Sequence, residues 1–234
     1  MLSDTSGPDP QSIEGYQYWT SFLCAETRHI EVIIHRTRAE SASKWISTAK
    51  QQQRLTGRDI GEYRRDGAGE FQSTEVYNFL EEEGILSRTT EPYNPQTNGQ
   101  TERFVRSMNT KSRAMLTYSG LPVTFWPQAV QEAARLYNRT PRQYQSKQWA
   151  TPLSRYQPDL EDSTPIKDFP IFGQFGHYLT VKQNQSNKFD DRGSPSIYLG
   201  CHDSLHILYC LKTHQIIRIR TFKTYGFSFV NDSF

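Results

Sequence analysis

Three carboxylates lie where they could act together on phosphate. Asp4 lies in the N-terminal stretch LSDTSGP, Asp66 ends a predicted strand, and Glu102 lies in the first turn of a predicted helix. Carboxylate oxygens are ligands that Mg²⁺ prefers, and Mg²⁺ keeps open positions for phosphate oxygens. Two such ions about 4 Å apart stabilise the attacking and leaving oxygens of an in-line phosphoryl displacement. The three residues together predict a site for two Mg²⁺ or Mn²⁺ ions, although any one of them alone is more often a solvated surface group.

The predicted helix that carries Glu102 runs from about Gln100 to Tyr118 and has a basic outer face. Asn98-Gly99 is expected to form a tight turn that aims Glu102. The helix N-terminus adds a positive dipole near it. At a spacing of three to four residues, one face carries polar and basic side chains, whereas the apolar Phe104, Met108 and Met115 are expected in the core. The predicted nucleic-acid-binding residues are Arg103, Arg106, Asn109, Lys111 and Arg113. Further along, Arg135, Arg139 and Arg142 could also neutralise phosphates, although Arg135 and Arg139 suit a solvated helix end as well.

The elements that must position these residues form a mixed α/β pattern. Residues 16–24 and 28–36 are aromatic and β-branched and predict two strands. Helical apolar spacing follows from residue 40 to about 55. A short strand is expected at 59–65, then a helix capped by Ser73 and stopped by Gly84. A further short strand (85–89), the Glu102 helix and a helix over about 124–138 complete the order β-β-α-β-α-β-α-α.

The character of the chain changes after residue 140. Five prolines punctuate the polar stretch 141–170, and four short strand patterns separated by turns follow it. We therefore predict a core at 1–140, a linker at 141–168 and a small all-β module at 169–234, either a barrel or a sandwich.

The net charge of +2 conceals a strong asymmetry along the chain. Residues 59–92 hold nine Asp/Glu against three Arg, whereas residues 99–150 hold eight Lys/Arg against two Glu. A basic region next to a carboxylate-rich one suits a phosphate-bearing partner bound beside a cation site, or equally a set of solvated helix faces. The sequence contains no run of about 18 apolar residues, so no membrane span is predicted. Three scattered cysteines predict neither a disulfide framework nor a zinc site.

Several motifs occur in order along almost the whole chain. The 36-residue offset from Asp66 to Glu102, with RRDGAGEF and PQTNGQTERF around them, resembles the catalytic core of retroviral and retrotransposon integrases. SDTSGP, the stretch from RAMLTYSGLP to YNRTP, TPLSRY and KFDDRGSPSIYLGC resemble copia-type retrotransposon integrases in particular.

This resemblance implies a fold, a site and a function. The fold would be an RNase H-like core, with a mixed five-stranded sheet and flanking helices, followed by an SH3-like module. The Asp-Asp-Glu triad would be Asp4, Asp66 and Glu102, acting as catalytic residues and as ligands of two Mg²⁺ ions. The implied partners are DNA, as element ends and target, and further copies of the chain in an active homo-oligomer. The implied location is the nucleus, after cytoplasmic assembly in virus-like particles.

The chain departs from the family in several places. Only Met1-Leu2-Ser3 precede Asp4, so we expect a poorly anchored stub of the first core strand and feeble activity. The family's DNGGEF motif is altered after Asp66, and its FIDDYSR has become FLCAETR. The family's upstream zinc-binding segment and downstream reverse transcriptase are missing from this sequence, which suggests a piece of a polyprotein.

Three functions remain open from the sequence. The first is an integrase, a polynucleotidyl transferase that trims a 3′ end and joins it to target DNA. The second is a catalytically dead nucleic-acid-binding relic of a retrotransposon polyprotein, which the short first strand favours. The third is a nuclease of the same superfold acting on RNA–DNA hybrids, against which the TNGQTER context argues.

Overall fold

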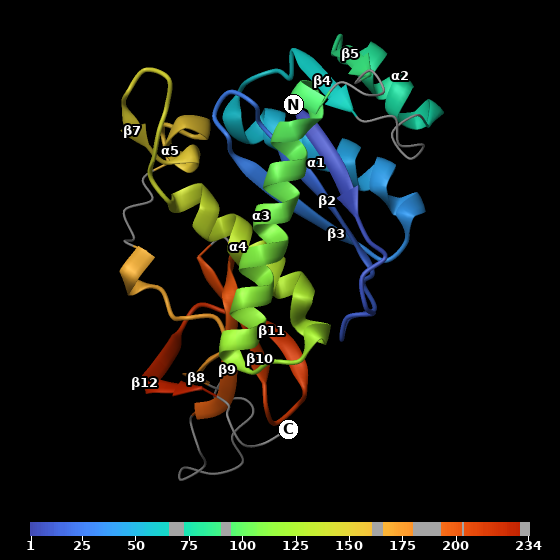
Figure 1. Ribbon diagram of the computed structural model, residues 1–234. Coiled ribbons are helices and arrows are strands. Elements are labelled where there is room, and N and C mark those ends of the chain that lie inside the picture. Colours follow the sequence, from blue (N-terminus) through green and yellow to red (C-terminus); the bar gives the residue numbers. More distant parts are fainter. Residues whose placement is uncertain (66–72, 90–94, 161–165, 180–192, 203, 230–234) are drawn as a thin grey trace. The chain divides into compact units, whose positions relative to one another are not determined.

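The computed structural model describes residues 1–65, 73–89, 95–160, 166–179, 193–202 and 204–229 (Figure 1). The chain divides into two units. The first holds residues 1–110 and 136–162, and the second holds 111–135 and 163–234. Two of the three boundaries, at 110/111 and 135/136, fall inside helices. The predicted division at residues 140 and 168 stays a prediction.

The sheet of the first unit has five strands in the order β3-β2-β1-β4-β5. β2 runs antiparallel to both β1 and β3, whereas β4 runs parallel to both β1 and β5. This mixed sheet confirms the predicted α/β class of the core. The strands are β1 Leu2–Ser6, β2 Tyr18–Leu23, β3 Ile30–His35, β4 Glu62–Arg65 and β5 Leu86–Thr89.

The first strand is not the stub that we expected. β1 continues past Asp4 to Ser6 and pairs with β2 at five positions. It also pairs with β4, where the Arg64 N–H donates to the Met1 carbonyl oxygen at 2.8 Å. Leu2 and Ser3 are buried. The expectation was wrong because Thr5 and Ser6 extend the ladder beyond Asp4 and because β1 lies between two partner strands.

Local signals in the sequence determine the ends of the first two helices. α1 (Ser41–Thr56) ends at Gly57, whose φ of 62° is the left-handed conformation that glycine favours. It is preceded by a short turn, η1 (Arg38–Glu40). α2 (Thr74–Glu82) begins after Ser73, whose hydroxyl accepts a hydrogen bond from the Val76 N–H. Both helix predictions are thereby confirmed.

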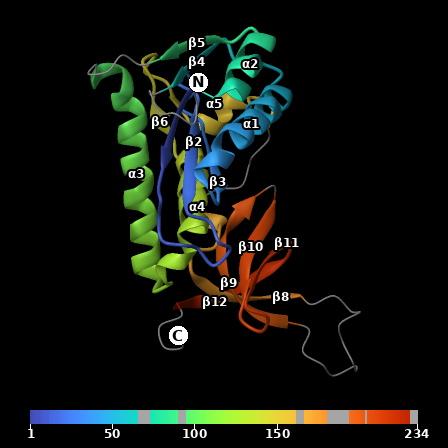
Figure 2. The same ribbon diagram turned by 90° about the vertical axis from the view of Figure 1, so that its right-hand side faces the viewer.

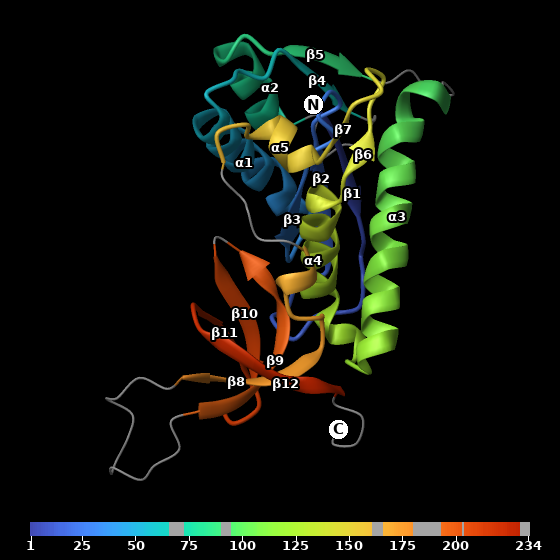
Figure 3. The same ribbon diagram turned by 90° about the vertical axis from the view of Figure 1, so that its left-hand side faces the viewer.

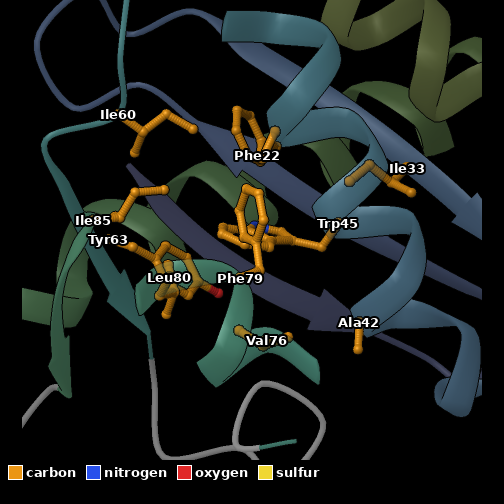
Figure 4. Packing of buried hydrophobic residues seen from close by; sticks show 11 residues of the cluster. Phe22, Ile33, Ala42, Trp45, Ile60, Tyr63, Val76, Phe79, Leu80 and Ile85 are labelled. Carbon is orange, nitrogen blue, oxygen red and sulfur yellow. The ribbon is translucent and has the colours of Figure 1, made fainter. Parts of the chain in front are cut away.

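Aromatic side chains dominate the core between the sheet and these helices (Figure 4). The Trp45 ring centroid lies 4.2 Å from that of Tyr63 and 5.8 Å from that of Phe22. Phe79 of α2 meets Trp45 edge-on. Because aromatic rings bury much apolar area each, this cluster anchors α1 and α2 to one face of the sheet.

The helix that carries Glu102 begins earlier than we predicted. α3 runs over Pro95–Ser119, so Asn98-Gly99 lies inside the helix and does not form the turn before it. Proline suits the first position of a helix, where its missing N–H costs no hydrogen bond. Phe104 and Met108 are buried and Met115 is partly buried, as expected. η3 (Val123–Phe125) and α4 (Trp126–Arg139) follow.

Part of the predicted linker has regular structure. β6 (Arg142–Gln143) and β7 (Trp149–Ala150) form a small antiparallel hairpin, and α5 (Pro152–Tyr156) follows it. Figure 3 shows this segment in yellow. The Tyr144 hydroxyl donates to the Thr27 carbonyl oxygen at 2.7 Å, so the hairpin contacts the turn between β2 and β3. A short turn, η4 (Ile166–Asp168), lies further along.

The second unit contains a five-stranded antiparallel sheet in the order β11-β10-β9-β8-β12. Its core joins Ile197 and Leu199 to Leu121 and Phe125, and Phe125 meets Tyr209 edge-on. This sheet agrees with the predicted all-β module. The strands are β8 Gln174–Leu179, β9 Gly193–His202, β10 Leu205–Cys210, β11 Gln215–Ile219 and β12 Phe222–Phe229.

No helix within the described ranges is both long and apolar enough to cross a membrane.

Candidate active site

Asp4 belongs to the central strand of the first sheet and faces away from α1. The Trp45 indole N–H donates to the Ser3 hydroxyl at 2.7 Å, which places the Ser3 side chain on the α1 face. Successive side chains of a strand point to opposite faces, so the half-buried Asp4 side chain points to the other face.

The backbone at Asp4 is held by the neighbouring strand. The Asp4 N–H donates to the Ser21 hydroxyl at 3.1 Å, and that hydroxyl lies 3.2 Å from the Asp4 carbonyl oxygen, to which it donates. Ser21 is fully buried on β2, directly opposite Asp4. A buried hydroxyl with partners on both sides fixes the strand position from which the Asp4 carboxylate projects.

A polar network lies under the same strand, on the α1 face. The Thr5 and Thr20 hydroxyl oxygens lie 2.8 Å apart, and the Thr20 hydroxyl lies 3.0 Å from His35 Nε2. His35 Nδ1 lies 2.8 Å from the Thr37 carbonyl oxygen, which can only accept, so Nδ1 carries the proton. In the neutral tautomer with the proton on Nδ1, Nε2 is the acceptor for the Thr20 hydroxyl. Sequence reasoning missed this network because its residues lie on three different elements.

Asp66 lies outside the described residues. The strand that precedes it is described as far as Arg65, and two registered pairs join it to β1, Leu2 with Arg64 and Ser3 with Arg65. Within the described ranges there is no group of three or more His, Cys, Asp or Glu residues that could hold a metal ion. The predicted triad includes Asp66, so its convergence stays a prediction.

Glu102 lies deeper in its helix than we predicted. It is the eighth residue of α3, in the third turn and not in the first. It is exposed, next to the buried Thr101. In Figure 2 the green helix α3, whose part up to Thr110 belongs to the first unit, lies on the opposite side of the sheet from α1. The helix that carries Glu102 therefore lies on the side of the sheet to which Asp4 points. Because Glu102 is not in the first turn, the argument from the helix dipole is weakened.

The predicted nucleic-acid-binding residues of α3 are mostly exposed. Arg103, Arg106, Asn109 and Arg113 are exposed, whereas Lys111 is half-buried. Exposed guanidinium groups can contact phosphate without reading base sequence. Their exposure agrees with the predicted basic face, and a role in binding stays a prediction.

No protein-family model matches the chain. The chain is 31% identical over 209 residues to the retrovirus-related Pol polyprotein from transposon TNT 1-94 of Nicotiana tabacum, and 24% identical over 204 residues to that from transposon RE1 of Arabidopsis thaliana. These alignments cover 87% and 86% of this chain. The chain is homologous to copia-type Pol polyproteins over most of its length. It spans 15% of the first relative and 13% of the second, so this copia-type homologue corresponds to one segment of each.

The fold of this copia-type homologue matches a chain of a retroviral intasome. That intasome, from simian T-cell lymphotropic virus, was solved in complex with PP2A regulatory subunit B56 gamma. The TM-score is 0.52 at 16% identity, and the match covers 95% of this chain and 77% of that one. At this identity the likeness shows the fold alone. It confirms the predicted fold of a mixed five-stranded sheet with helices, and the antiparallel five-stranded sheet that follows is consistent with the predicted SH3-like module.

Proposed function

We propose that this chain is the catalytic region of a retrotransposon integrase, a polynucleotidyl transferase that joins element DNA to target DNA. The observation that carries the proposal is the position of Asp4 on the central strand of an integrase-type sheet, beside β4. Homology over 87% of the chain to a retrovirus-related Pol polyprotein supports the same function.

The strand register supports a pair of aspartates. The described pairs Leu2–Arg64 and Ser3–Arg65 have the same offset in residue number. If the same register continues by one residue, Asp4 would pair with Asp66. In a parallel ladder, residues at matching positions project to the same face. We therefore propose that Asp4 and Asp66 form one half of the site and that Glu102, on the same side of the sheet, completes it.

The donor set fits Mg²⁺ or Mn²⁺. All three proposed ligands are carboxylates, which suit hard cations. When bound, two divalent ions would stabilise charge on the attacking and leaving oxygens of the phosphoryl displacement. The chain's own contribution is positioning, because Ser21 fixes the backbone of Asp4 and the rigid helix α3 carries Glu102. The exposed Arg106 and Arg113 of that helix would hold DNA phosphates.

The proposed partners are DNA and further copies of the chain, and the proposed location is the nucleus. The alternative, a catalytically dead relic, rested on a stubbed first strand. Because β1 pairs with β2 at five positions, that argument no longer favours the relic.

Strand transfer tests the proposal. The chain would be incubated with oligonucleotides that mimic the element's ends, labelled target DNA, and Mg²⁺ or Mn²⁺. Asp4→Asn, Asp66→Asn and Glu102→Gln should each lower the rate by about 10²-fold or more, because each variant removes a charged ligand. Glu75→Gln is the matched control, since Glu75 is an exposed carboxylate of α2.

Two results would contradict the proposal. One is strand transfer by Glu102→Gln at the rate of the unsubstituted chain. The other is the absence of metal-dependent transfer by the unsubstituted chain, which would make the relic the better explanation.

A further inference from the structure

Tyr144 is the centre of a cluster of arginines in the first unit. The Arg155 guanidinium carbon lies 4.1 Å from the centroid of its ring, and the Arg28 guanidinium carbon lies 5.4 Å from it. Its hydroxyl donates to the Thr27 carbonyl oxygen, and the side chain is 7% exposed. A buried ring that is hydrogen-bonded at its tip provides a fixed platform for both guanidinium groups.

A third arginine joins the cluster from β6. The Arg142 guanidinium lies 3.8 Å from the ring centroid of Tyr137, and Nη2 donates to the Tyr137 carbonyl oxygen at 3.5 Å. Burial raises the pKa of the Tyr144 hydroxyl, while the positive charges of Arg142, Arg155 and Arg28 act to lower it. Arg142 precedes Tyr144 by two residues in the same hairpin, which places it in the same region as the other two arginines.

No carboxylate neutralises this cluster in the described part of the chain. Arg28, Arg142 and Arg155 form no ion pair there, and the buried Arg142 Nε has no hydrogen-bond partner. The sequence from Arg139 to Tyr156 contains four basic residues and no Asp or Glu. Three like charges held together without counter-ions repel one another, so an anionic partner would be bound favourably.

The chemistry of the cluster suits phosphate. Stacking on tyrosine uses one face of a guanidinium and leaves N–H donors at its edge for oxygens. Arg142 already uses Nη2 on the Tyr137 carbonyl oxygen and its Nε is buried, so fewer of its donors remain. Phosphate accepts such donors in parallel pairs. The positions come from the β2–β3 turn, the β6–β7 hairpin and α5, so the spacing of the three donors is set by the fold and not by one mobile loop.

We propose that Arg28, Arg142 and Arg155 form a second nucleic-acid-binding surface that takes the sugar–phosphate backbone of a DNA or RNA strand. The choice of nucleic acid over an acidic peptide rests on the proposed function. The surface itself requires neither the carboxylate site nor the basic face of α3.

Fluorescence anisotropy in EDTA tests this surface, because binding can then be followed without metal-dependent chemistry. The probes are one sequence as duplex DNA, single-stranded DNA and RNA, together with a poly-glutamate peptide. The triple variant Arg28→Gln/Arg142→Gln/Arg155→Gln should bind nucleic acid on the order of tenfold more weakly at low salt. On duplex DNA its log–log salt slope should fall by about 0.9 for each phosphate that the variant no longer neutralises.

Two further variants make the test specific. Arg54→Gln/Lys167→Gln/Lys212→Gln removes three exposed charges elsewhere and should bind like the unsubstituted chain. Replacing Arg28, Arg142 and Arg155 by Lys should keep the salt slope, because the charges remain, while weakening binding through loss of the paired donors. Unfolding midpoints of all variants show whether each one is folded.

Three results would contradict the proposed binding surface. The first is a nucleic-acid affinity of the Gln variant equal to that of the unsubstituted chain. The second is an equal loss of affinity in the control variant that removes three exposed charges elsewhere. The third is a Gln variant that still binds nucleic acid but no longer binds the poly-glutamate peptide, which would assign the cluster to an acidic peptide. Loss of strand transfer in Glu102→Gln with normal binding in EDTA concerns the carboxylate site alone, so failures of the two proposals are distinguishable.

Discussion

Asn138 of α4 binds both backbone groups of Ile30 at the open edge of β3. The Ile30 N–H donates to Asn138 Oδ1 at 3.0 Å, and Asn138 Nδ2 donates to the Ile30 carbonyl oxygen at 2.7 Å. Both residues are buried. The side-chain amide therefore takes the place of a neighbouring strand at an edge that would otherwise leave backbone groups unpaired.

Replacing Asn138 should destabilise the fold in a graded way. Asn138→Ala leaves two buried backbone groups without partners, at a cost of about 1–3 kcal/mol each. Asn138→Asp should cost at least as much, because a carboxylate can accept from the N–H but repels the Ile30 carbonyl oxygen. Urea denaturation measures both losses. Asn109→Ala, at an exposed position of α3, should change stability by no more than about 0.5 kcal/mol. Equal losses at the two positions would contradict this role.

Replacing Ser3 should lower both the stability of the fold and the rate of strand transfer. Ser3→Ala removes the acceptor of the buried Trp45 indole N–H, which lies 2.7 Å from the hydroxyl, and should cost about 1–3 kcal/mol. Because Ser3 precedes Asp4 on β1, the rate of strand transfer should fall as well. Ser47→Ala, on the exposed side of α1, is the control for both measurements. A Ser3→Ala chain with unchanged stability would show that the indole finds another partner.

His29 should make stability depend on pH below neutrality. It is stacked on Tyr156 with ring centroids 4.1 Å apart, and burial, helped by the charge of Arg139, lowers its pKa to about 4. Between about pH 6.5 and pH 4 the unfolded chain takes up a proton that the folded chain does not, so stability falls as pH falls. The loss approaches about 3 kcal/mol and is absent above the unfolded pKa.

The comparison that isolates His29 is the pH dependence of urea denaturation in His29→Phe, which keeps a planar ring. The stability of this variant should fall less steeply with falling pH than that of the unsubstituted chain. His202→Gln, at an exposed position, should keep the slope of the unsubstituted chain. Identical slopes in His29→Phe and the unsubstituted chain would mean that His29 titrates normally.

Gly173 occupies a position where even a methyl group should not fit. Its φ is +83°, and a Cβ there would lie 2.1 Å from Ser119 Cβ. Gly57 also has a positive φ but has no atoms near a Cβ position. Gly57→Ala should therefore cost about 1–2 kcal/mol from backbone strain alone, and Gly173→Ala clearly more. Thermal unfolding of the two variants measures the difference, and equal shifts in Tm would exclude a steric contribution from Ser119.

Sequence patterns predict the elements that depend on local signals. The helix limits near Ser73 and Gly57 follow from capping and backbone preference, and the structure confirms both helices. The start of α3 was predicted wrongly, because Asn98-Gly99 has strong turn propensity yet lies within the helix. β1 was underestimated since its length is set by partners far away in sequence, which local propensity does not report.

The candidate site shows the same division. The SDTSGP motif points to Asp4, and the spacing from Asp66 points to Glu102. The structure places the helix that carries Glu102 on the side of the sheet to which Asp4 points. The arginines around Tyr144 come from segments more than 100 residues apart, so no local pattern could join them. The available signal was the absence of acidic residues from Arg139 to Tyr156.

The central claim is that Asp4, Asp66 and Glu102 converge on divalent metal. It is tested most directly by a crystal structure of the chain soaked with Mn²⁺, in which anomalous scattering locates the ions. The account predicts manganese about 2 Å from carboxylate oxygens of both Asp4 and Asp66, with Glu102 on the same site. Manganese bound elsewhere, with the Asp66 carboxylate on the opposite face of the sheet from Asp4, would contradict it.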